Sequence, residues 1–202
     1  MQKVYSYKDE FPSAREITGN YAGVSSRVFS LDENHSRRIL KITQRNSIER
    51  VRSDLDFYKG HFPQLIPETQ VYNLSEGVGI VQPWINGSRF ADMPESKLME
   101  ILKGTPKVRD QLINLLENFV LAFQRKRLYP DPVGFPQSNE LVHSVNIFYQ
   151  NGGSSCITLC DTGLSPHEDT LKKHGESAYL LSHNMDYFEK MKKWLELLKR
   201  MG

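Results

Sequence analysis

The chain has 202 residues, of which 39% are hydrophobic and 25% are charged, and its formal net charge is +2. A chain of this length can bury a substantial core, as one domain or as two small lobes. Because the charges nearly balance and no long run of one sign occurs, the composition argues against nucleic acid as the main partner.

The sequence also argues against membrane insertion and secretion. No apolar stretch is long enough to span a bilayer, and the polar start MQKVYSYKDE is unlike a secretory signal. The two cysteines, Cys156 and Cys160, fall on one expected strand about 13 Å apart, which is beyond disulfide reach. We interpret them as reduced packing residues and expect a cytoplasmic protein.

The first part of the chain is predicted to be mainly β-structure. Residues 21–31 and 37–43 form two strand-like runs, joined by a polar turn at residues 32–36. A turn containing Gly19 and Gly23 leads into the first run. Glycines there either make a plain turn or let backbone N–H groups approach phosphates.

The second run places a lysine inside an apolar strand. By strand alternation, Lys41 shares a face with Ile39 and Thr43, opposite Leu40 and Ile42. A lysine in this position is either a solvent-facing side chain or a functional cation.

A helix is predicted next. Asn46 begins it as the N-cap, with Glu49 as a capping-box residue, and Gly60 ends it. Its buried stripe follows 3-4-3 spacing: Ile48, Val51, Leu55 and Tyr58.

The acids of this helix differ in their position relative to the stripe. At about 100° per residue, Glu49 and Asp56 project away from it, whereas Asp54 borders it. Asp54 is therefore the better candidate for a buried acid, and a solvated helix acid is the alternative.

Residues 68–74 and 77–81 are predicted to form a hairpin. The segment that follows begins with Gln82, Pro83 and Trp84 and is a natural boundary. We therefore expect two lobes, residues 1–83 with an antiparallel sheet plus one helix, and residues 84–202 with helices and a further hairpin.

The second lobe is predicted to be mostly helical. Residues 95–102 form one short helix, and Thr105 caps a longer one with Pro106 at its first position. The apolar face of the longer helix consists of Ile113, Leu116, Phe119, Val120 and Phe123. A closing helix has an apolar side made of Met185, Phe188, Met191, Leu195 and Leu198, and we expect it to dock on the core.

The second predicted hairpin of the chain contains candidate metal ligands. Its strands are residues 145–149 and 156–159, with a turn around residues 151–153 that sets Asn146 near Ile157 or Leu159. Asp161 then lies only a few residues from Asn146. An amide oxygen and a carboxylate at one hairpin mouth suit Mg²⁺, although an ordinary surface hairpin has the same pattern.

The order Asp131, Asn146, hairpin, Asp161-Thr162-Gly163 resembles the catalytic segment of the protein-kinase-like superfamily. The aminoglycoside-phosphotransferase branch and other small bacterial kinase-like proteins are the nearest matches. Two features depart from the family pattern. Asp131 and Asn146 are further apart than in the family, and Tyr129-Pro130 stands in place of His-Arg or His-Gly.

The resemblance implies an α+β fold with two lobes, one β-rich and one helical and truncated. It also implies ATP and Mg²⁺ as cofactors and phosphate transfer as the reaction. By the same resemblance, Lys41 holds phosphates and is oriented by Asp54 or Glu49, and the turn at Gly19 and Gly23 covers them.

The remaining roles follow the same resemblance. The adenine ring would contact the Gln82 carbonyl and the Trp84 N–H, on the assumption that Val81 precedes the hinge. Asn146 and Asp161 would hold the metal, and Asp131 would orient the acceptor hydroxyl or take its proton.

Three function classes stay open at this point. The first is a phosphotransferase whose acceptor is a small molecule or a protein. The second is a pseudokinase or nucleotide-binding regulatory module, which the displaced Asp131 favours. The third is a structural or partner-binding protein, for which the basic closing helix is the best feature.

Overall fold

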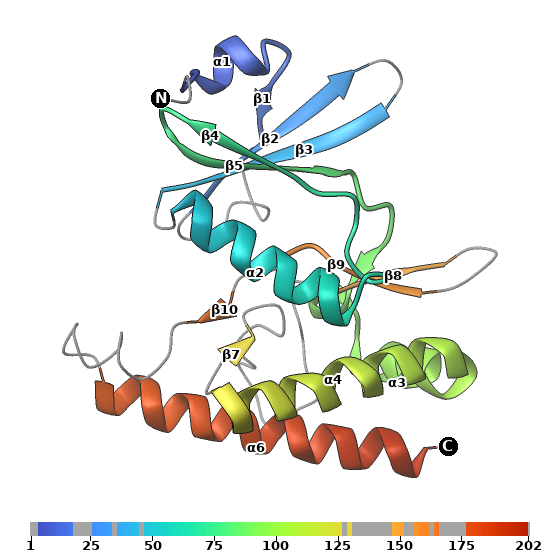
Figure 1. The fold of residues 1–202 in the computed structure, drawn as a ribbon. Coiled ribbons are helices and arrows are strands. Elements are labelled where there is room, and N and C mark those ends of the chain that lie inside the picture. The colour runs from blue at the N-terminus through green and yellow to red at the C-terminus, as the bar shows by residue number, and fades with distance from the viewer. Residues whose placement is uncertain are drawn as a thin grey trace. The chain divides into compact units, whose positions relative to one another are not determined.

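Figure 1 shows the computed structural model of the chain, which describes residues 4–17, 26–33, 36–44, 47–126, 129–130, 147–151, 156–161, 164–165 and 177–201. The chain divides into two compact units, residues 1–85 and residues 86–202. Each unit is described by itself below.

The N-terminal unit is built on an antiparallel five-stranded sheet with the strand order β1-β2-β3-β5-β4. The strands are β1 (Arg15–Glu16), β2 (Ser26–Glu33), β3 (Ser36–Thr43), β4 (Gln70–Leu74) and β5 (Gly77–Pro83). The strand order departs from the chain order only at β5, which lies between β3 and β4.

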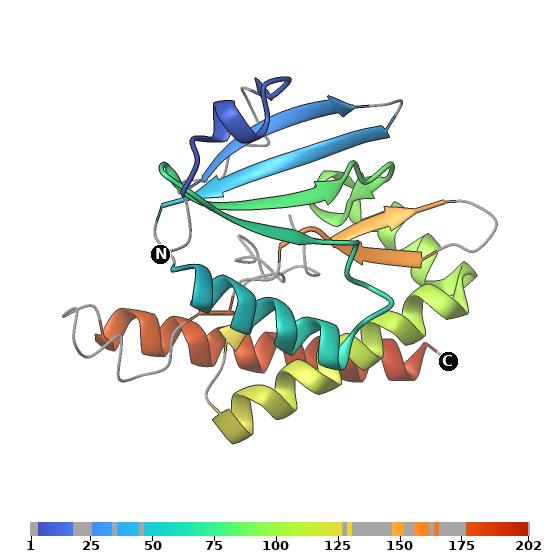
Figure 2. The ribbon, with the colours of Figure 1, turned by 45° about the horizontal axis from the view of Figure 1, so that its top comes forward.

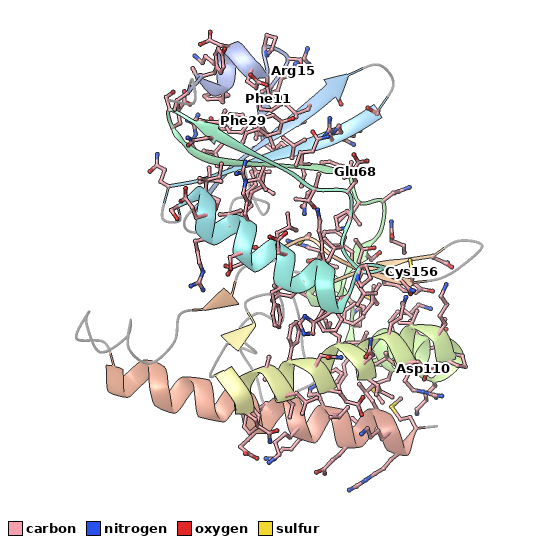
Figure 3. All side chains as sticks on the ribbon, in the orientation of Figure 1. Phe11, Arg15, Phe29, Glu68, Asp110 and Cys156 are labelled. Atoms are coloured by element: carbon pink, nitrogen blue, oxygen red, sulfur yellow. The ribbon has the colours of Figure 1, made fainter. Side chains whose placement is uncertain are left out.

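Two helices cover opposite faces of this sheet, α1 (Tyr7–Glu10) on one and α2 (Ile48–His61) on the other (Figures 1 and 2). The core on the α1 side includes Phe11 and Phe29, which lie between this helix and the strands in Figure 3. Its buried members are Phe11, Phe29, Leu31, Leu40, Ile42, Leu74 and Val81.

The predicted hairpin of β2 and β3 is present, but its turn is shorter than residues 32–36. The strands stay paired as far as Glu33 and Ser36. Asp32 lies opposite Arg37 within the ladder. Opposite charges directly across two strands stabilise the pair, which explains why these polar residues are part of the strands.

The predicted helix is confirmed as α2, with corrected ends. The N-cap is Ser47, whose Oγ accepts a hydrogen bond from the Arg50 N–H at 3.2 Å, and not Asn46. The helix runs one residue beyond Gly60, and the Phe62 N–H closes the last turn on the Tyr58 carbonyl at 2.7 Å. Tertiary packing of the buried Phe62 thus overrides glycine as an end signal.

The hairpin of β4 and β5 is also confirmed, with its turn at Ser75 and Glu76. Gly77 follows the turn with φ at 139°, and a Cβ there would meet the Thr43 carbonyl oxygen. Only glycine fits both conditions without strain.

The C-terminal unit contains the helices α3 (Glu95–Gly104), α4 (Pro106–Lys126) and α6 (Ser177–Arg200), and a short 3-10 helix, η1 (Phe90–Asp92). Helices α4 and α6 pack side by side (Figures 1 and 2). No helix in the described ranges is long and apolar enough to cross a membrane.

The closing helix docks on the core, as predicted. Its buried residues are Phe188, Met191, Trp194 and Leu198. Lys199 forms an ion pair with Glu117 of α4 at 2.6 Å, and Arg109 of α4 donates to the Met201 carbonyl at 3.0 Å. Trp194 takes the place that the sequence pattern gave to Leu195, which is only half-buried.

The apolar face of α4 is rotated from the predicted one. Leu116 and Phe119 are buried as expected, whereas Ile113 and Val120 are half-buried. The buried set is Val108, Leu112, Leu115, Leu116 and Phe119. Helix α4 packs on both α6 and β9 (Cys156–Leu159), so its buried face is wider than one stripe.

The C-terminal unit also contains two small antiparallel sheets. The first has the order β6-β8-β9, with β6 (Ser88–Arg89), β8 (Ile147–Gln150) and β9 (Cys156–Leu159). The second pairs β7 (Tyr129–Pro130) with β10 (Leu164–Ser165). The sequence did not indicate β6, which is only two residues long and falls in a segment predicted to be helical.

The element order is the one expected from the sequence: an antiparallel sheet with a helix between its third and fourth strands, then a mostly helical unit with a hairpin. The predicted α+β fold class, with a β-rich part followed by a mostly helical part, is therefore confirmed.

A carboxylate clamp fastens α1 to the β4–β5 turn. Glu76 accepts hydrogen bonds from the Ser6 hydroxyl at 2.7 Å, the Tyr7 N–H at 3.1 Å and the Ser75 hydroxyl at 3.0 Å. Partial burial alone would raise the pKa of Glu76, but these hydrogen bonds outweigh it and hold the pKa below its usual range.

We predict that Glu76→Gln lowers the free energy of unfolding by about 1 kcal/mol at neutral pH. Because the folded pKa lies below the unfolded value of about 4.3, the clamp stabilises the fold above that value. The stabilisation is lost as the pH falls through the folded pKa. Urea unfolding at neutral and acidic pH measures the difference, which should shrink on acidification.

The matched control is Glu68→Gln, because Glu68 is an exposed glutamate of the same unit. An equal loss of stability in both variants would rule out the clamp as the cause.

Candidate functional site

Lys41 lies on the face of the sheet that α2 covers. Its strand neighbours Leu40 and Ile42 belong to the core on the α1 side. Successive side chains alternate between faces, so Lys41 points to the opposite side. The strand register sets it between Val28 of β2 and Ile80 of β5, and it is half-buried.

Asp54 is the buried acid of α2, as the helical periodicity predicted. It is 6% exposed, whereas Glu49 and Asp56 are both exposed. Arg50, one turn earlier, holds the Asp54 carboxylate at 2.9 Å. The sheet face with Lys41 is therefore covered by a helix whose buried side carries one carboxylate.

At the end of β5, one of the two predicted base contacts is bonded within the sheet. The Trp84 N–H donates to the Arg37 carbonyl of β3 at 2.8 Å, so it is not available to a base while this bond exists. Hydrogen-bonded pairs alternate along antiparallel strands. The backbone groups of Gln82, which lies opposite Ile39, therefore also face β3.

By the same alternation, the backbone carbonyl of Pro83, which follows Gln82, faces away from β3. Strand β4 begins at Gln70, opposite Val81, so no strand lies beside the outer edge of Pro83. Pro83 has no N–H and offers only its carbonyl there. No described residue accepts a hydrogen bond from the Ile85 N–H.

Two side chains hold this segment in place. The Arg37 guanidinium lies over the Trp84 ring at 3.8 Å from its centroid, a cation–π contact. Together with the backbone bond between the same two residues, it fixes the direction in which the chain leaves β5.

A buried polar chain lies beside the hinge. The Gln82 side-chain amide donates to Thr69 Oγ1 at 3.1 Å, and the Thr69 hydroxyl donates to the Pro67 carbonyl at 2.8 Å. Gln82 is 3% exposed and Thr69 is 8% exposed. Sequence reasoning missed the side chain of Gln82, although a glutamine directly after an apolar strand run was the available signal.

The predicted second hairpin is present as β8 and β9, with a register that differs from both predicted ones. Ile147 lies opposite Leu159, and Gln150 lies opposite Cys156. The connection therefore contains residues 151–155 and is longer than a two-residue turn. The next pair in this register would be Asn146 with Cys160, and Asn146 itself lies outside the described residues.

Helix α4 positions the hairpin. Its Gln111 side chain accepts a hydrogen bond at 3.1 Å from the Ile157 N–H of β9, the outer strand of the sheet. Asp161 follows two residues after β9 and is partly buried. Neither Cys156 nor Cys160 forms a disulfide.

The small sheet of β7 and β10 joins two segments that are far apart in the sequence. Pro130 lies opposite Leu164, and Tyr129 lies opposite Ser165. The residues just before Asp131 therefore pair with the residues just after Asp161-Thr162-Gly163.

Four predicted site residues lie outside the described ranges: Gly19, Gly23, Asp131 and Asn146. Within the part of the chain that the structure describes, no group of three or more His, Cys, Asp or Glu side chains could hold a metal ion. The roles assigned to these residues stay predictions.

Comparisons with known proteins were made at the level of sequence and of structure. Neither models of protein families nor curated protein sequences match the chain. Among solved structures, a spectinomycin phosphotransferase in complex with ADP and spectinomycin is 14% identical, with a TM-score of 0.45, over 88% of this chain and 73% of that one.

Two further solved structures resemble the chain. A kinase of the Cydia pomonella granulovirus is 14% identical, with a TM-score of 0.45, over 77% of this chain and 55% of that one. An aminoglycoside phosphotransferase is 12% identical, with a TM-score of 0.46, over 96% of both chains. These likenesses are distant, so the function is argued below from the residues of this chain.

We predict that Gln111→Leu loosens the hairpin that carries Asp161. The Ile157 N–H would lose its acceptor, which should lower the free energy of unfolding by about 1 kcal/mol. Amide hydrogen exchange should show faster exchange at Ile157. Gln124→Leu on the exposed side of the same helix is the control, and unchanged exchange at Ile157 in Gln111→Leu would contradict the prediction.

Proposed function

We propose that the chain is an ATP- and Mg²⁺-dependent phosphotransferase whose acceptor is a hydroxyl group of a small molecule or a protein. The observation that carries the proposal is the position of Lys41. It is a half-buried cation on the sheet face covered by α2, the helix whose buried acid is Asp54. A cation held in this way is suited to bind phosphate oxygens.

The base is proposed to bind at the end of β5. In place of the Gln82 carbonyl and the Trp84 N–H, the contacts are the Pro83 carbonyl and the Ile85 N–H. The Pro83 carbonyl faces away from β3, and no described residue accepts a hydrogen bond from the Ile85 N–H. One acceptor and one donor match the amino group and the ring nitrogen of adenine. The turn at Gly19 and Gly23 is proposed to cover the phosphates.

The metal is proposed to bind at Asn146 and Asp161. Carboxylate and amide oxygens are ligands that Mg²⁺ accepts, and this ion commonly binds to one or two protein oxygens plus phosphates. Asp161, directly after the hairpin, fits that donor set. The ion would supply charge neutralisation at the phosphates, while Asp131 orients the acceptor hydroxyl or takes its proton.

The proposal predicts that ATP stabilises the chain mainly in the presence of Mg²⁺. At a hundredfold excess over Kd, binding should add about 2.7 kcal/mol to the free energy of unfolding. Thermal-shift titrations with and without Mg²⁺ measure this effect. Asp161→Asn should reduce the Mg²⁺-dependent part, and Asp110→Asn, an exposed carboxylate of the same unit, should not.

No change in melting temperature with millimolar ATP and Mg²⁺ would reject the nucleotide site. Phosphate transfer to a panel of acceptors then separates an enzyme from a regulatory module. Asp131→Asn should keep ATP binding and lose transfer. Tight ATP binding with no transfer by the wild type would favour a pseudokinase.

Lys41 and Asp54 should act as one unit in ATP binding. Lys41→Ala should weaken binding, and Asp54→Ala should do so nearly as much. The double variant should fall short of the sum by roughly 1–2 kcal/mol, because each residue acts through the other. Isothermal titration calorimetry measures the coupling, with Asp56→Ala as the exposed control. Strictly additive losses of binding free energy would show that Lys41 and Asp54 act independently.

A further inference from the structure

Gln82 is a buried amide at the end of the strand proposed to lead to the base. It lies opposite Ile39, and Ile39 shares the α2 face of β3 with Lys41 because the two are separated by one residue. Its neighbour Val81 faces the other way, into the core on the α1 side. The side chain of Gln82 is therefore on the phosphate-binding face of the sheet, one residue before the Pro83 carbonyl.

The hydrogen bonds of Thr69 determine which way this amide points. The Thr69 hydroxyl uses its only proton on the Pro67 carbonyl at 2.8 Å. It is left as an acceptor for Gln82, so the group at 3.1 Å must be the NH₂ end of the amide. The oxygen Oε1 is therefore directed away from Thr69.

No described residue donates a hydrogen bond to this oxygen, although Gln82 is only 3% exposed. A buried acceptor without a donor is costly, and such groups in folded proteins usually have a partner or a function. A ligand that brings an N–H group to this point would satisfy it.

We propose that Gln82 selects purine nucleotides that carry an amino group at C6 and rejects those that carry a carbonyl there. This inference rests on the proposed function. The C6 amino group has two N–H bonds, so it can donate one to the Pro83 carbonyl and the other to Gln82 Oε1. A C6 carbonyl would instead place an acceptor against two acceptors.

Thr69 is a positioning residue in this arrangement. Without its hydroxyl the amide is free to turn over and present its NH₂ group, which a C6 carbonyl would accept. Removing Thr69 Oγ1 should therefore change the choice between bases more than it changes the affinity for ATP.

The test measures Kd for Mg²⁺–ATP and Mg²⁺–ITP by calorimetry on the full chain, since the two nucleotides differ only at C6 and N1. The wild-type preference for ATP should exceed the preference given by the hinge backbone alone by roughly ten- to hundredfold, the range expected when one buried acceptor is left unpaired. Gln82→Leu and Thr69→Val should both bring this ratio close to that of the hinge alone, and Thr69→Ser should restore it.

Thr43→Val is the matched control, because Thr43 is a buried threonine of β3 at the end away from Trp84, and its ratio should equal that of the wild type. Melting curves of each variant show that it is folded. Equal binding of ATP and ITP by the wild type, or a ratio unchanged in both Gln82→Leu and Thr69→Val, overturns the inference and leaves the nucleotide site standing. Binding of neither nucleotide overturns both.

Discussion

The candidate site depends on the alternation of side chains along two neighbouring strands of the N-terminal sheet. Leu40 and Ile42 on β3, and Val81 on β5, are buried in the core on the α1 side. Because successive side chains of a strand point to opposite faces, burial of these three apolar residues on one face places Lys41 and Gln82 on the other face. A slip of one residue in either strand would exchange the two sets and remove the cation from the face that α2 covers.

The same alternation controls the backbone at the end of β5. Every second residue along β5 and its extension directs its N–H and carbonyl toward β3, as the hydrogen bond from the Trp84 N–H to the Arg37 carbonyl shows. The residues between them keep their backbone groups for other partners, because β4 does not extend beside Pro83. A proline at this point costs no ladder bond. One register thus decides which side chains and which backbone groups a ligand on this face would meet.

Much of this arrangement could be predicted from the sequence, because local patterns carry it. The strand around Lys41, the helix after it and the buried position of Asp54 all follow from short-range periodicity. The backbone groups at the end of β5 that bond to β3 could not be predicted, since Val81 and Gln82 are both plausible last residues of an apolar strand. Hydrogen bonds between residues far apart in the sequence could not be predicted either. Examples are the bond between Gln82 and Thr69 and the bond between Gln111 and Ile157.

The wide spacing between Asp131 and Asn146 is physically compatible with one site. The described residues on either side of the intervening segment are both in strands: Pro130 pairs in β7, and Ile147 pairs in β8. The entropic cost of closing a loop rises only slowly with its length, by about 0.6 kcal/mol for each doubling. A longer connection between two fixed ends therefore costs little stability.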